Sequence, residues 1–125
     1  MSQIRKRLRL TREEALMAKP VKNINIRWKK NEKGEVLLYL SRKKSKIINL
    51  LSRIFFIPEE KIINLDKVGT YVWELCNGEN SVKEIVVSLQ KKFNLNFKES
   101  EVSTLEYLKK LAQRGIIGLA ISKKR

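Results

Sequence analysis

The apolar residues of this chain change their spacing part-way along it. Ile24, Ile26 and Trp28 alternate with polar residues, a pattern typical of a half-buried strand. After Asp66 the apolar residues recur every three or four positions, which is typical of helices that pack one face against a core. Strands followed by helices predict an α+β domain.

Turn residues divide the first part of the chain into strands. Residues 24–29 and 36–40 flank a turn at residues 31–34, and this arrangement predicts a hairpin. Residues 61–65 predict a third strand. Residues 47–57 fit either a helix or a strand with a loop, and both alternatives stay open. We therefore expect a small antiparallel sheet in the N-terminal half.

Capping signals divide the second part into three helices. Asp66 precedes the first helix, and Ser81 with Glu84 forms a capping box before the second. The third helix is expected at residues 99–114, and residues 116–121 then form an extended tail like the wing of a winged helix. The inward positions expected on the third helix are Val102, Leu105, Leu108 and Ala112. The predicted fold is α+β, a small antiparallel N-terminal sheet followed by a three-helix, winged-helix-like bundle.

Residues 1–22 are expected to form a basic arm, either mobile or simply solvated. Thr11 and Glu14 match a capping box for a short helix there, and Pro20 would stop that helix. The domain itself is expected over residues 23–122.

The charge is strongly positive and unevenly placed. The formal net charge is +15, and residues 1–58 hold 16 of the 28 lysines and arginines but 4 of the 13 acids. Such a field favours an anionic partner. No apolar run approaches the ~20 residues that cross a bilayer. The basic N-terminus has no apolar stretch behind it, so it is not expected to be a secretory signal. We expect a cytoplasmic protein without a transmembrane segment.

The composition argues against catalysis. The chain has no histidine and one cysteine, Cys76. These counts remove the commonest acid–base group and cannot supply a zinc site or an iron–sulfur cluster. The five glycines form no phosphate-binding loop. We expect no catalytic residue, metal site or cofactor, and Cys76 is expected to be a buried apolar residue. A protein that binds another macromolecule is therefore favoured over an enzyme.

Residues 63–78 carry a recognisable pattern, Leu-(Asp/Asn)-x-x-(Ala/Gly)-x-x-(Ile/Val)-(Leu/Trp)-x-Leu-x-(Asp/Asn)-Gly. The matching residues are Leu65, Asp66, Gly69, Val72, Trp73, Leu75, Asn77 and Gly78. This pattern resembles the PqqD-like family, named for pyrroloquinoline quinone (PQQ) biosynthesis protein D. The spacing continues through Ser81, Ile85, Leu89, Phe93, Leu105, Leu108, Leu111 and Gly115. The basic arm, an insertion at residues 43–60 and Asn77 in place of an acid depart from the family pattern.

The resemblance implies a peptide-binding protein without a cofactor. Such proteins capture the leader of a precursor peptide and present it to a modifying enzyme, often a radical S-adenosylmethionine enzyme. The resemblance also implies that an extended peptide binds as an additional strand beside the third strand. In this family the third strand is expected to lie beside the third helix. The expected peptide-binding residues are Lys61, Ile62, Ile63, Asn64, Leu65, Val102, Leu105, Glu106 and Lys109. Ordinary core packing is the alternative for Ile63, Leu105 and Leu108.

Other partners stay open. A winged-helix nucleic-acid-binding protein fits the positive charge and the order of the helices. Against it, the N-terminal end of the third helix, which would meet the bases, carries Glu99 and Glu101. Attachment of the arm to an anionic membrane surface and a homodimer formed through exposed strand edges are further alternatives. The sequence does not identify the peptide ligand, the enzyme or the pathway.

Overall fold

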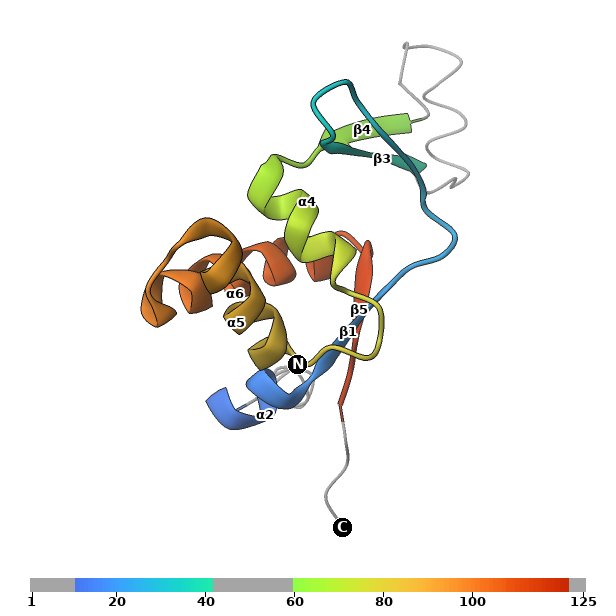
Figure 1. Ribbon diagram of the computed structural model, residues 1–125. Coiled ribbons are helices and arrows are strands. Elements are labelled where there is room, and N and C mark those ends of the chain that lie inside the picture. The colour runs from blue at the N-terminus through green and yellow to red at the C-terminus, as the bar shows by residue number, and fades with distance from the viewer. Residues whose placement is uncertain (1–10, 42–59, 122–125) are drawn as a thin grey trace. The chain divides into compact units, whose positions relative to one another are not determined.

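The computed structural model describes residues 11–41 and 60–121 of the chain (Figure 1). These residues fall into two compact units. The sheet unit spans residues 24–67, and the helical unit combines residues up to 23 with residues from 68 onward. The helical unit is therefore assembled from two stretches of chain that flank the sheet unit in the sequence.

In the part of the sheet unit that the structure describes, three strands form an antiparallel sheet. Its strands are β2 (Arg27–Lys30), β3 (Val36–Ser41) and β4 (Glu60–Asn64), in the order β2–β3–β4. The buried apolar side chains of the sheet include Val36 and Leu38 from β3, which are both 0% exposed. The expected hairpin and third strand are confirmed. The expected insertion lies outside the described residues, except for residue 60.

A polar turn closes the hairpin. The side-chain oxygen of Asn31 accepts hydrogen bonds from the backbone N–H groups of Lys33 and Glu35, at 2.9 and 3.0 Å. Gly34 has a φ of 78°, a left-handed conformation that glycine adopts without strain.

The first strand of the hairpin differs from the expectation. Residues 24–26 form a turn and a bend, and β2 begins only at Arg27. All four β2 residues are exposed, and Ile24 is 92% exposed. The strand forms, but its predicted start at residue 24 and its predicted half-buried face are wrong, because Ile24 and Ile26 fall in the turn and bend that lead into β2.

The described residues of the helical unit form four helices and a two-stranded sheet. Its elements are α2 (Arg12–Met17), β1 (Lys19–Lys22), α4 (Lys67–Glu74), α5 (Val82–Phe93), α6 (Phe97–Gln113) and β5 (Ile117–Ala120). Its largest fully buried side chains include those of Pro20, Val72, Cys76, Val82, Ile85, Val86, Leu89, Ser100, Thr104 and Ile116. None of the helices in the described ranges is long and apolar enough to cross a membrane.

Three of the described helices begin with a capping box. The caps are Thr11, Ser81 and Asn96, and in each box the cap side chain and the glutamate three residues later accept each other's backbone N–H. The boxes at Thr11 and Ser81 confirm the predictions. The box at Asn96 starts α6 earlier than expected. The backbone N–H of Ser81, and then its side chain, lower the pKa of the Glu84 carboxyl.

The tail that we expected as a wing forms β5, which pairs antiparallel with β1 (Figure 1). Pro20 lies opposite Leu119 in this pair. The Pro20 carbonyl accepts the N–H of Gly78 at 2.8 Å, and the Lys22 N–H donates to the Cys76 carbonyl at 3.1 Å. Strand β1 is thus bonded on both sides, although its residues were expected to belong to a basic arm.

An ion pair joins α2 to α6. A guanidinium nitrogen of Arg12 lies 2.7 Å from a carboxylate oxygen of Glu101, which is 5% exposed. The hydrogen bond to Glu101, followed by the carboxylate charge, raises the pKa of Arg12. A buried carboxylate is costly unless it is paired, so Arg12 gives this glutamate its counter-charge.

The α+β class is confirmed, with small antiparallel sheets and four described helices. The strands belong to two separate sheets, where the sequence predicted one. The difference arises because β1 and β5, which come from the two ends of the described chain, pair only with each other as strands.

We expect Arg12→Ala to destabilise the protein by leaving the Glu101 carboxylate buried without its counter-charge. Urea unfolding of the wild type, R12A, E101Q and R12A/E101Q measures this coupling. The R12A change should lower the free energy of unfolding more in the wild-type background than in the E101Q background. Equal effects in the two backgrounds would contradict a stabilising α2–α6 ion pair.

Candidate functional site

The strand β4 is an edge of the described sheet. It pairs antiparallel with β3, and within the described residues no strand lies on its other side. Edge strands carry backbone donors and acceptors that no neighbouring strand uses, and these groups can pair with an added chain.

The hydrogen-bond pattern indicates which β4 groups point outward. The Leu65 N–H donates to the Val36 carbonyl at 2.8 Å, so these residues form a hydrogen-bonded pair. Bonded and non-bonded pairs alternate along an antiparallel ladder. Ile63, opposite Leu38, therefore bonds to β3, whereas Ile62 and Asn64 direct their N–H and C=O groups away from it.

From Ile62 to Leu65 the side chains of the predicted β4 residues alternate between exposed and more buried positions. Ile62 is 57% exposed, and Lys61 and Asn64 are also exposed. Ile63 is half-buried and Leu65 is buried. Core packing was the alternative left open for Ile63, and it accounts for the buried part of the Ile63 side chain. Ile62 exposes its apolar side chain to solvent.

The four predicted residues on α6 form one exposed stripe. Val102, Leu105, Glu106 and Lys109 are all exposed, and their spacing of three, one and three residues places them on one side of a helix. Val102 is 43% exposed and Leu105 is 37% exposed. We name these four residues the α6 stripe.

The expected packing of α6 is partly wrong. Leu108 is buried as predicted, but Val102 and Leu105, which were also expected to point inward, are exposed. The buried positions near the start of the helix are instead polar, namely Ser100, Glu101 and Thr104. The Ser100 hydroxyl donates to the Val86 carbonyl at 2.6 Å, and Arg12 pairs with Glu101. These bonds allow the polar side chains of Ser100 and Glu101 to face the core.

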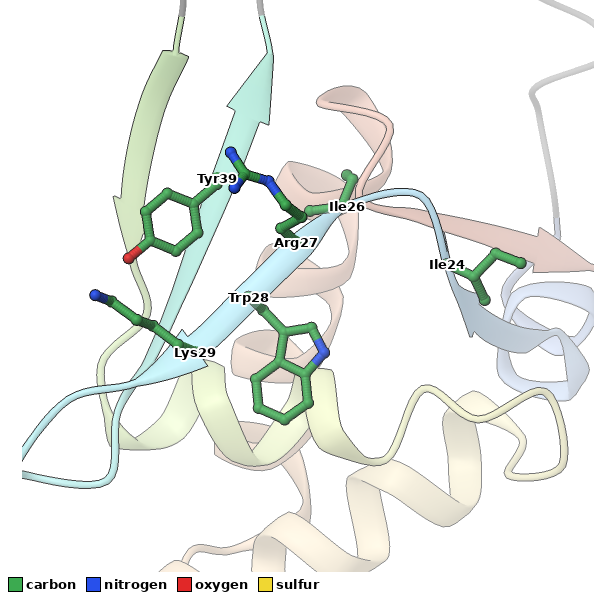
Figure 2. Close-up of a pocket in the computed structure, with 6 residues that line it drawn as sticks. All are labelled: Ile24, Ile26, Arg27, Trp28, Lys29 and Tyr39. Carbon is green, nitrogen blue, oxygen red and sulfur yellow. The ribbon is translucent and has the colours of Figure 1, made fainter.

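A further surface lies on the sheet unit, and the sequence reasoning did not identify it. A shallow hollow of about 670 Å³ is lined by Ile24, Ile26, Arg27, Trp28, Lys29 and Tyr39 (Figure 2). We name it the cationic hollow. The alternation of basic residues with Trp28 in a strand was the available signal, but exposed basic residues are usually only solvated.

Two cations lie close to the same ring in the cationic hollow. The guanidinium carbon of Arg27 is 5.6 Å from the ring centre of Tyr39, and the ammonium of Lys29 is 5.7 Å from it. Both distances are within the range of cation–π attraction. Figure 2 shows both basic side chains reaching toward Tyr39, while Trp28 points away from it.

The buried Cys76 is unsuited to nucleophilic chemistry. It is 0% exposed, and its thiol donates to the Val72 carbonyl at 3.2 Å. Burial raises the pKa of the thiol to about 12, against a smaller opposing effect of the Lys22 charge. Since the thiolate is the reactive form, this cysteine is held in its unreactive state.

The chain belongs to the PqqD family. The family model described as Coenzyme PQQ synthesis protein D (PqqD) matches residues 36–117, which include β4 and α6. No curated protein and no solved structure shows a significant match to the chain. Proteins of the PqqD family bind a precursor peptide and act with a modifying enzyme in PQQ biosynthesis, as non-catalytic accessory proteins. At the level of the family, the function is therefore peptide binding in a biosynthetic pathway.

We expect Cys76 to resist thiol reagents in the folded protein. At pH 8 a thiol with a pKa of about 12 is ionised in roughly one molecule in ten thousand. An unfolded cysteine is ionised in roughly a quarter of molecules. Reaction with a disulfide reagent should therefore be at least about a hundredfold slower in buffer than in urea. Similar rates in the two solvents would show that Cys76 is accessible and ionised.

Proposed function

We propose that this protein captures the leader of a precursor peptide by adding it as a strand to β4 and presents the peptide to a modifying enzyme. A radical S-adenosylmethionine enzyme is the proposed partner. The observation that carries the proposal is the outward direction of the Ile62 and Asn64 backbone groups on an edge strand. The family membership of the chain supports the same role.

Strand addition explains how one surface can bind a peptide in a defined register. Backbone hydrogen bonds to Ile62 and Asn64 would set the position of the peptide, and side-chain contacts would select its sequence. The exposed side chain of Ile62 would contact apolar residues of the added strand. Such an interaction needs no reactive group in the binding protein.

The α6 stripe is the second surface that we propose for the same peptide. Val102 and Leu105 would bury apolar peptide side chains, and full burial of such residues contributes about 1.5–3 kcal/mol each. Because both are already more than half covered, each would contribute roughly 1 kcal/mol on binding. Glu106 and Lys109 would add charged contacts beside this apolar pair.

Ile62→Pro tests the strand addition. The Ile62 N–H points away from β3, so proline removes an outward donor without removing a bond of the sheet. We expect I62P to bind a leader peptide roughly tenfold or more weakly, because a donor is lost and the ring obstructs the edge. The probes are synthetic peptides that correspond to any short open reading frame neighbouring the gene, and their binding is measured by isothermal titration calorimetry.

Ile62→Ala is the matched control, because it keeps the N–H and removes only the exposed side chain. I62A should lose less affinity than I62P, and unfolding in urea should show that the sheet tolerates both changes. Equal binding by I62P and the wild type would exclude β4 as the pairing strand.

A second pair of variants tests the α6 stripe. We expect V102A/L105A to weaken leader binding roughly tenfold, since two partly exposed apolar side chains are shortened. Lys110→Ala, which shortens an exposed residue on a different side of α6 from the stripe, is the control. The proposal also predicts amide NMR shifts in residues 61–65 and α6. Shifts confined to basic residues on addition of DNA, with no response to the leader, would favour the nucleic-acid alternative.

A further inference from the structure

The cationic hollow combines positive charge with apolar surface and, among its described lining residues, has no acidic side chain. Arg27 and Lys29 are exposed and lie on the same face of β2. Tyr39 is directly opposite Arg27 in the pairing of β2 with β3. The shared cation–π contacts hold both cationic groups beside one ring, so the two charges are partly pre-positioned.

The spacing of the two cations defines the shape of a complementary partner. Arg27 and Lys29 are two residues apart in a strand, which corresponds to about 7 Å along the chain. An extended peptide places its own alternate side chains on one face at the same spacing. Two acidic residues separated by one residue in an extended segment therefore match Arg27 and Lys29 in charge and in their spacing along the strand.

The geometry points to a docking site for a protein partner that presents such a segment, with acidic residues at alternate positions. The Arg27 guanidinium and the Lys29 ammonium bind the two carboxylates, and the exposed apolar side chain of Ile24 contacts the residues beside them. The net charge of +15 attracts an acidic partner to this surface.

The arrangement of the aromatic rings favours a peptide over single-stranded nucleic acid. Nucleic-acid binding of this kind relies on open aromatic faces on which bases stack. Here both cations lie within cation–π distance of the Tyr39 ring. Trp28 follows Arg27 in the strand, so its ring points to the opposite face and forms no common platform with Tyr39.

This site is separate from the strand edge proposed for the leader peptide. β2 and β4 pair with opposite sides of β3. A partner held by Arg27 and Lys29 therefore leaves the outward groups of Ile62 and Asn64 accessible, and both interactions can occur together. The docking site does not depend on whether the leader binds at β4.

The test uses a dye-labelled short peptide with two glutamates at alternate positions, titrated with the full chain and followed by fluorescence anisotropy. We expect R27Q/K29Q to bind this peptide roughly tenfold more weakly, as expected for the loss of two exposed charge contacts. K91Q/K92Q removes the same charge from exposed positions of α5 and should bind like the wild type. The same peptide with glutamines, or with the two glutamates adjacent, should bind more weakly.

Several results would overturn the docking site. Equal losses in R27Q/K29Q and K91Q/K92Q would show attraction by net charge alone. Tighter binding of an oligothymidylate than of the peptide, dependent on Arg27 and Lys29, would assign the surface to nucleic acid. In the unmodified protein, amide shifts on peptide addition should centre on Arg27, Lys29 and Tyr39, and their absence there would exclude the site. Leader binding should be unchanged in R27Q/K29Q, so the two proposals can fail independently.

Discussion

The register between β3 and β4 determines what the sheet unit can offer to a partner. The bond from the Leu65 N–H to the Val36 carbonyl determines which β4 residues bond to β3 and which direct their backbone groups outward. The burial of Val36, Leu38 and Leu65 stabilises this register. A slip of one residue would expose these side chains and exchange the inward and outward backbone groups of β4. The burial of apolar side chains on one face of the sheet thus keeps the backbone N–H and C=O groups of Ile62 directed outward at the edge.

One side of helix α6 packs against the core, and another side is exposed to solvent. Its buried side near the N-terminus is polar, and Ser100 and Glu101 are satisfied by hydrogen bonds to α5 and to Arg12. This arrangement leaves apolar residues such as Val102 and Leu105 on the exposed stripe. Both side chains therefore stay accessible for the peptide contact proposed above.

The sequence predicted the second half of the fold well, because its capping boxes and helical periodicity are local signals. It missed β1, since that strand depends on hydrogen bonds to β5, about a hundred positions further along. It misassigned the packing of α6 because hydrophobic periodicity places Ser100 and Glu101 in solvent. The residues of β4 were predicted from their pattern, whereas Arg27 and Lys29 look like an ordinary solvated strand until Tyr39 is found beside them.

The pairing of β1 with β5 also constrains when the protein can fold. Residues 19–22 emerge from the ribosome early, yet their strand partner is complete only after residue 120 has been added. Closing so long a loop is slow compared with forming local helices. The sheet unit, whose strands are nearer in sequence, can assemble first, whereas the helical unit is complete only once residue 120 is available, so a nascent chain that stops before β5 would lack it.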